Sequence, residues 1–85
     1  PISIQEIHSA FKSKKQSDYD VEGVYLFIDP RGSIVNVGMT KHKTITDRIG
    51  NQHVYGGSGS DLRDMLGRPP IEEILRYQSP IFAKV

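Results

Sequence analysis

The 85-residue chain has room for one small domain with a modest core, and its 36% hydrophobic and 25% charged residues are typical of a globular chain, not a disordered one. The lack of cysteine excludes a disulfide framework and a thiolate metal site and is compatible with a cytoplasmic location, and no apolar run is long enough to span a bilayer. A net charge of +1 excludes a general polycation but not a local basic patch.

The first predicted element is a short amphipathic helix over residues 3–12. Ser3 is followed three residues later by Glu6, which is the spacing of a capping box at a helix start. Apolar side chains then recur at helical spacing as far as Phe11. The polar stretch that follows, up to residue 22, is expected to be a loop.

The next stretch, "GVYLFIDPRGSIVNVG", predicts an antiparallel hairpin. Residues 23–29 and 33–38 are rich in β-forming side chains, and they flank the tetrapeptide "DPRG". This tetrapeptide has Pro30 at the second position of a turn and Gly32 at the fourth, as a type I turn prefers.

A second helix is expected within "TKHKTITDRIGNQH". Thr44 and Asp47 can cap its start, and Ile45 and Ile49 supply a buried stripe. Arg48 and Gln52 lie one helical turn apart on a neighbouring face, with His53 at or just past the end of the helix.

The remaining sequence predicts two short helices and a strand. After the flexible "YGGSGS", a capped helix is expected within residues 60–67, and Pro70 suits the first turn of a helix that holds Ile71, Ile74 and Leu75. Residues 80–85 read as a third strand. The whole chain, 1–85, is therefore predicted to be a single α+β domain: a small three-stranded sheet, mixed or antiparallel, made of the hairpin and a third strand and flanked by short helices.

Few residues suggest chemistry. Tyr25, His53 and Arg48 have the side chains that phosphodiester hydrolysis needs, provided that the hairpin and the second helix pack together. The alternative is that Tyr25 is a core residue and Arg48 a solvated one. The Gly-rich loop can offer backbone N–H groups to a phosphate oxygen, or it is merely flexible. The histidines lack the spacing of a zinc site.

The order and spacing of several motifs resemble the GIY-YIG nuclease family. "GVY" at 23–25 and "NVG" at 36–38 lie ten residues apart, like the two triplets of the family, and "GMT" at 38–40 is similar to its following G-x-[ST]. "ITDRIGNQH" at 45–53 resembles the family helix with its arginine, and "GSGSDLRDML" resembles a Gly/Ser step into an "LRxxL" helix. The likeness spans about residues 23–66, and residues 80–85 fit the third strand of the family.

The resemblance implies a metal-dependent endonuclease that hydrolyses DNA one strand at a time, with Mg²⁺ or a similar ion, in the cytoplasm or at the nucleoid. Tyr25 matches the tyrosine that helps to activate the attacking water, and Arg48 matches the arginine that stabilises the charged phosphate. His53 is similar to a family His or Tyr, but it lies five residues after Arg48 instead of four, and Gln52 takes the fourth place. Asn36 stands where the family has its second tyrosine, and an amide cannot act as a base.

The metal contact follows from the same resemblance, and the nucleic-acid contacts follow from a local basic cluster and the Gly-rich loop. The metal-binding glutamate of the family lies on a helix after the third strand, so it either lies beyond Val85 or is absent, and Glu73 is a weak substitute. DNA contacts are expected from the residues near the motifs: Lys41, Lys43, Gly57, Ser58 and Arg63. The competing hypotheses are a catalytically inactive module that binds nucleic acid and a small domain that binds another protein.

Overall fold

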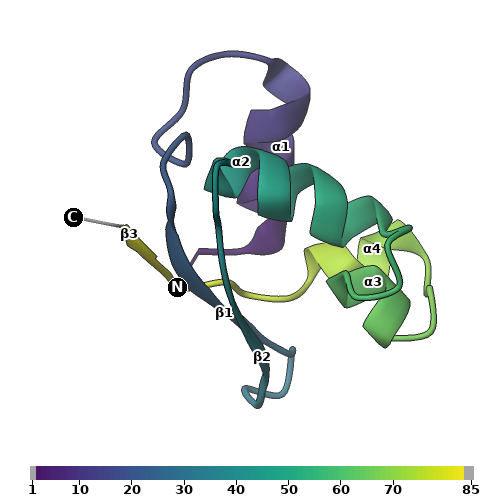
Figure 1. Cartoon of the computed structure of the whole chain (residues 1–85). Helices are drawn as coiled ribbons and strands as arrows, with labels where there is room; N and C mark the ends of the chain where they lie inside the picture. The colour runs from purple at the N-terminus through teal and green to yellow at the C-terminus, as the bar shows by residue number, and fades with distance from the viewer. Residues whose placement is uncertain (1, 84–85) are drawn as a thin grey trace.

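The computed structural model describes residues 2–83 as a small α+β fold in which a three-stranded antiparallel sheet is joined by four short α-helices (Figure 1). Strands β1 (Gly23–Ile28), β2 (Ile34–Met39) and β3 (Ile81–Ala83) lie in the order β2-β1-β3. Both neighbours of β1 are antiparallel to it, so the sheet is not mixed. The part of the expected third strand at residues 84–85 lies outside the described residues.

The turn between β1 and β2 forms as predicted. The N–H of Gly32 donates to the carbonyl of Asp29 at 2.9 Å, which closes the four-residue turn. Oδ1 of Asp29 accepts from the backbone N–H groups of Arg31 and Ser33, both at 2.9 Å. Gly32 has a φ of +94°, a conformation that favours glycine. The pairing register shifts between Phe27 and Ile28, so the hairpin carries a β-bulge at this end.

Helix α1 (Ile4–Ser13) begins at the predicted cap, but the capping box is only half formed. Oγ of Ser3 accepts from the N–H of Glu6 at 3.2 Å. The carboxylate of Glu6 does not return the bond to the backbone of Ser3 and accepts instead from the hydroxyl of Tyr19 at 3.1 Å. Glu6 thus ties the following loop to the helix, a contact that the local sequence pattern cannot reveal.

The second predicted helix forms as one rod of two hydrogen-bonding types. Helix α2 (Ile45–Asp47) is capped by Oγ1 of Thr44, which accepts from the N–H of Asp47 at 3.1 Å. It continues without a break into the π-helical segment η1 (Arg48–His53). The carbonyl of Gly50 in this segment accepts a 2.8 Å hydrogen bond from Nδ1–H of His8 in α1. Because a π turn is closed by hydrogen bonds between residues five apart, it brings the side chains of such residues closer to one face of the helix than an α turn does.

Two short helices follow, α3 (Leu62–Met65) and α4 (Ile71–Leu75). Gly67 ends the first with a φ of +83°, and Pro70 directly precedes the second. Asp61 holds the N-cap position of α3, but its side chain makes no capping hydrogen bond, because it is turned toward η1. Among residues 2–83 no helix is long and apolar enough to cross a membrane.

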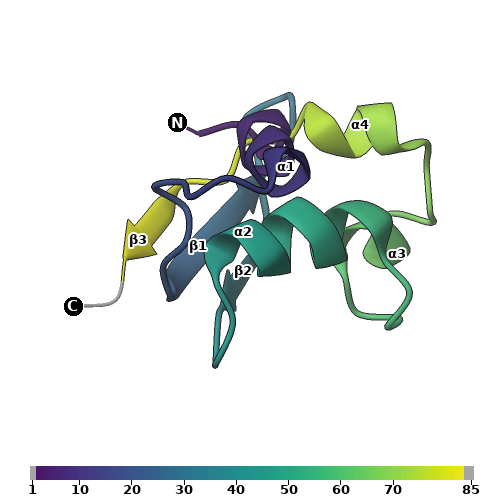
Figure 2. The ribbon, with the colours of Figure 1, turned by 90° about the horizontal axis from the view of Figure 1, so that it is seen from above.

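The helices cover one face of the sheet, and α1 and the α2–η1 rod lie side by side upon it (Figures 1 and 2). The core between these layers combines strand and helix side chains: Ile4, Ile7, Tyr25, Phe27, Ile45, Ile49, Val54, Leu62 and Ile74. Tyr25 pairs with Gly38 and Phe27 with Asn36 across the hairpin, so Tyr25 and Asn36 share the covered face. The opposite face exposes apolar side chains, among them Val24, Val37, Met39 and Phe82.

Candidate active site

The centre of the site is a hydrogen bond between β1 and η1. The hydroxyl oxygen of Tyr25 lies 2.8 Å from Nε2 of His53, and both side chains are buried. The tyrosine ring lies directly over Gly38 of β2, where an added Cβ would come within 2.5 Å of Cζ of the ring. The glycine of the second triplet therefore leaves the space that the first-triplet tyrosine fills.

The protonation of His53 follows from its two partners. The backbone N–H of Leu62 donates to Nδ1 of His53 at 2.9 Å, so this nitrogen must be an acceptor without a proton. In the neutral ring the proton then lies on Nε2, which donates to the oxygen of Tyr25. The hydroxyl proton of Tyr25 remains available for another acceptor. His53 therefore acts on the phenol as a hydrogen-bond donor and not as its base.

Burial sets the acid–base behaviour of both groups. Burial and, to a smaller extent, the nearby Arg48 charge lower the pKa of His53 from 6.5 to about 4, although the Asp61 charge acts in the opposite sense. His53 is therefore neutral at physiological pH. Burial also raises the pKa of Tyr25 above its usual 10, although the charge of Arg48 and a weak hydrogen bond from it oppose this rise. The phenol thus keeps its proton in the structure as it stands.

The π turn explains how His53 reaches Tyr25 although it lies five residues after Arg48. In a regular α-helix a residue five positions after another is rotated by about 140° beyond one full turn, so the side chains of Arg48 and His53 would point to different faces. The π-helical pattern of η1 turns His53 back toward the face of Arg48. Gln52, which holds the place expected for the family histidine, bonds to Arg48 instead, with Oε1 at 3.0 Å from Nη1.

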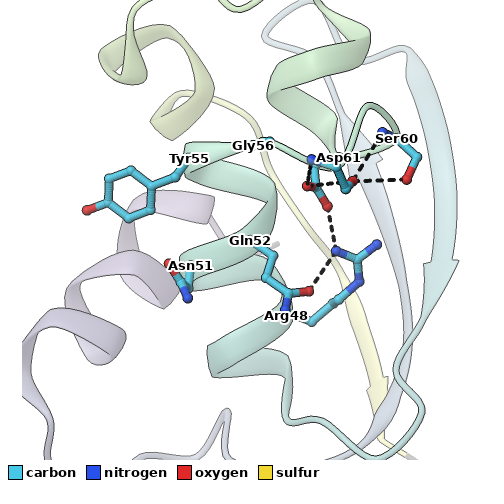
Figure 3. A pocket seen from close by; sticks show the side chains of 9 residues that line it. Arg48, Asn51, Gln52, Tyr55, Gly56, Ser60 and Asp61 are labelled. Carbon is cyan, nitrogen blue, oxygen red and sulfur yellow. Dashed lines mark hydrogen bonds and ion pairs between the residues drawn. The ribbon is translucent and has the colours of Figure 1, made fainter.

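Arg48 lines an open pocket of about 570 Å³ at the end of this rod (Figure 3). Its Nη1 also donates to Oδ1 of Asp61 at 2.7 Å. The Arg48 side chain is 25% exposed and that of Asp61 is 5% exposed, so the pair lies at the floor of the pocket. The rest of the lining comes from the rod and the Gly-rich loop: Asn51, Gln52, Tyr55, Gly56, Gly57, Ser58 and Ser60.

Asp61 is a site residue that the sequence did not reveal. Its Oδ2 accepts from the hydroxyl of Ser58 at 2.8 Å and from the Ser58 N–H at 3.3 Å, while its Oδ1 faces Arg48. Burial alone would raise the pKa of the Asp61 carboxyl, but the hydrogen bonds from Arg48 and Ser58 together lower it below the usual value, so Asp61 is ionised. Its sequence position suggested only a helix cap, and no spacing rule links it to Arg48.

The Gly-rich loop is already filled by a carboxylate of this chain. Oδ2 of Asp64 accepts from the N–H of Gly57 at 2.8 Å and of Gly59 at 3.0 Å, and its Oδ1 pairs with Arg68. The N–H of Ser58 points to Asp61. The backbone N–H groups of Gly57 and Ser58, expected to hold a phosphate, therefore have partners within the chain.

The other expected contacts lie apart from Arg48. Asn36 shares a sheet face with Tyr25, but its Nδ2 lies 3.6 Å from the sulfur of Met65 and its Oδ1 accepts from its neighbour, Val37. The exposed Lys41 and Lys43 precede α2, at the opposite end of the rod from the Gly-rich loop, and Lys43 pairs with Asp47 at 3.6 Å.

Arg63 is held by the backbone. Its Nε donates to the carbonyl of Pro69 at 2.9 Å, and its Nη1 donates to the carbonyl of Tyr55 at 3.1 Å. These bonds tie α3 to the segments on either side of it. Of the residues expected to contact DNA, Gly57 and Ser58 line the Arg48 pocket, whereas Arg63 and the two lysines do not.

The residues described here do not fit a divalent-ion site. Within residues 2–83 no group of three or more His, Asp or Glu side chains could hold a metal ion. Glu73 is exposed on α4 and does not line the Arg48 pocket. Asp61, the carboxylate nearest to Arg48, has both oxygens engaged by Arg48 and Ser58.

Comparisons of the chain with protein-family models, with curated proteins and with solved structures found no match.

Proposed function

We propose that the chain is a GIY-YIG-like endonuclease domain that hydrolyses phosphodiester bonds of DNA. The observation that carries the proposal is the joining of Tyr25 in β1 and His53 in η1 by a 2.8 Å hydrogen bond. The two residues are 28 positions apart in the sequence, and Arg48 is on the same rod, beside an open pocket. The resemblance of the motifs requires these three side chains to meet.

Each side chain has a task that its environment supports. Tyr25 accepts a hydrogen bond from His53, which leaves its own O–H free to donate to a water or a phosphate oxygen. Arg48 supplies guanidinium N–H donors at the floor of the pocket, where they can stabilise the oxygens of the phosphate as charge develops on them. His53 stays neutral and orients the phenol, so it is a positioning residue in this scheme.

A divalent ion belongs to the proposal through the resemblance alone. Mg²⁺ would supply stabilisation of the leaving oxygen. Residues 2–83 do not fit such an ion, so the roles proposed for Tyr25, Arg48 and His53 depend on these side chains alone.

The second candidate is a catalytically inactive module that keeps the fold and binds nucleic acid. Two observations favour it. Tyr25 is only 1% exposed, so substrate reaches the phenol only if neighbouring side chains move. Asn36, in place of a second phenol, is bonded to its own strand and to Met65.

The two candidates separate in a nicking assay with supercoiled plasmid and a branched DNA, in Mg²⁺, Mn²⁺ or EDTA. Nicking that needs the ion and falls about 100-fold or more in Tyr25→Phe and in Arg48→Ala supports the nuclease. Tyr77→Phe and Arg31→Ala are matched controls, because no side-chain hydrogen bond or ion pair is found for either residue in the described part of the chain. Salt-sensitive DNA binding without nicking under any ion would reject the nuclease in favour of the inactive module.

A further inference from the structure

The bonds from the guanidinium group of Arg48 to Gln52 and Asp61 both use one of its three nitrogens. Nη1 carries two hydrogens, and both are used: one bonds to Oε1 of Gln52 at 3.0 Å and the other to Oδ1 of Asp61 at 2.7 Å. Within residues 2–83 Nε and Nη2 make no hydrogen bond of ordinary length, but the guanidinium lies close enough to the Tyr25 hydroxyl for a weak hydrogen bond that opposes the rise in the pKa of the phenol, so this side of Arg48 adjoins Tyr25. Figure 3 shows these two nitrogens on the side of the guanidinium that faces away from Asp61 and Gln52.

The free nitrogens form one recognition edge. Nη1 is the terminal nitrogen on the Cδ side of a guanidinium, so Nε–H and one N–H of Nη2 are parallel on the other side. This pair matches two oxygens of a phosphate, which Arg binds in a bidentate manner. Because Nη1 is bonded to Gln52 and Asp61, a phosphate cannot bind across Nη1 and Nη2. The edge formed by Nε and Nη2 remains able to bind it.

The clamp is rigid because Asp61 is itself fixed. Its second oxygen accepts from the hydroxyl and the N–H of Ser58, and the residue is 3% exposed. The N–H of the next residue, Leu62, is bonded to His53, which is bonded to Tyr25. The orientation of Arg48 is thus coupled to the position of the phenol through three hydrogen bonds and the Asp61–Leu62 peptide link.

We propose that Asp61, assisted by Gln52, is a positioning residue that clamps Nη1 of Arg48 so that the Nε–Nη2 edge is presented to a phosphodiester group of the nucleic acid. The proposal rests on the proposed nuclease function. The ion pair with Asp61 also neutralises the charge of Arg48. The pocket therefore recognises a phosphate by the geometry of its hydrogen-bond donors and not by net charge, which agrees with the low net charge of the chain, +1.

The decisive variant is Asp61→Asn, which keeps the shape and an acceptor oxygen but loses the charge. Asp29→Asn is its matched control, because it removes the same charge in the β1–β2 turn, away from the pocket. Binding of a fluorescent DNA duplex is measured by anisotropy across a range of KCl, and nicking is measured at saturating DNA. For Asp61→Asn we expect no loss of DNA affinity, and a plot of log affinity against log salt concentration whose slope is steeper by about one. Its maximal nicking rate should be lower than that of the wild type by about 10-fold or more. Asp29→Asn should match the wild type in both.

Two further measurements keep the test decisive. Arg48→Lys preserves the charge without the bidentate edge, so its salt slope should stay unchanged while nicking falls about 30-fold or more. Guanidinium NMR of Arg48 requires no DNA: slow exchange of the Nη1 and Nη2 signals is expected in the wild type and faster exchange in Asp61→Asn.

Each outcome decides the proposal. Wild-type nicking by Asp61→Asn, or equal falls of affinity and rate in that variant, would overturn it. If Asp61→Asn fails to fold, wild-type nicking by Arg48→Lys overturns it and the expected loss supports it. If the wild-type protein nicks no DNA, the nuclease function fails, and unchanged guanidinium exchange and salt slope in Asp61→Asn would then reject the clamp separately.

Discussion

The backbone N–H of Leu62 donates a 2.9 Å hydrogen bond to Nδ1 of His53, and this single bond determines where the imidazole carries its proton. If His53 were protonated, its Nδ1–H would face the backbone N–H of Leu62, and the two donors would repel each other. Burial, the largest cause, and the Arg48 charge lower the pKa of His53 to about 4, so the ring is neutral, as the bond from Leu62 requires. The bond links the start of α3 to the phenol of Tyr25 through one ring.

The low pKa of His53 predicts a pH-dependent stability. The unfolded chain binds a proton at His53 below about pH 6.5 and the folded chain only below about pH 4, so the free energy of unfolding decreases as the pH falls through this window. The full loss is about 3 kcal/mol. Urea unfolding at intervals between pH 7 and pH 4 measures it. The carboxyl groups of Asp61 and Asp64 have pKa values below the usual one, so most of the stability that they contribute is lost at a lower pH than the His53 transition.

The matched variants are His53→Gln and His42→Gln. His53→Gln should flatten the pH dependence by most of the predicted amount, whereas His42→Gln changes an exposed residue and should retain the wild-type slope. Equal slopes in the wild type and His53→Gln would show that another group titrates.

Gly38→Ala tests the close approach of the Tyr25 ring to β2. The new Cβ would lie 2.5 Å from Cζ and 2.6 Å from Cε2 and the hydroxyl oxygen, and the bond to His53 prevents the ring from moving aside. We expect a loss of about 2 kcal/mol or more, although removing a glycine from a strand otherwise stabilises it by about 0.5–1 kcal/mol. Chemical denaturation gives the value. In a Tyr25→Leu background the same substitution should have almost no cost, and an equal cost there would contradict the steric explanation.

Gly50→Ala tests the crossing of α1 and η1. An added Cβ would lie 2.8 Å from the carbonyl oxygen of Ile7 and 2.9 Å from Cβ of Phe11. In an open helix this substitution stabilises by about 1 kcal/mol, but here we expect a loss of about 2 kcal/mol. The opposite sign makes thermal or urea unfolding a sharp measurement. Asn51→Ala, the neighbouring and partly exposed position, should change the stability by less than about 0.5 kcal/mol.

Asp64→Ala tests the carboxylate that fills the Gly-rich loop. Without it the N–H groups of Gly57 and Gly59 lose their acceptor, so their hydrogen exchange should become faster by about tenfold or more, while exchange in β1 is unchanged. Amide exchange by NMR measures both. Protection that persists at the two glycines would mean that another group accepts from them.

Local sequence determined most of the secondary structure, because caps and turns depend on residues a few positions apart. Ser3 and Thr44 begin their helices as predicted, and Pro30 and Gly32 place the turn. The shared face of Tyr25 and Asn36, in contrast, depends on the register between the two strands. The shift between Phe27 and Ile28 pairs Phe27 with Asn36 and so puts Asn36 on the face of Tyr25.

Tertiary structure alone decided the contacts of the candidate site. The π turn brought His53 instead of Gln52 to Tyr25, and the path of the loop brought Asp61 to Arg48, 13 residues away. Folding also brought the carboxylate of Asp64 to the Gly-rich loop, where it accepts a hydrogen bond from the N–H of Gly57. Such pairings are selected by the free energy of satisfying buried polar groups after the elements have packed, and no spacing in the sequence encodes which carboxylate will arrive.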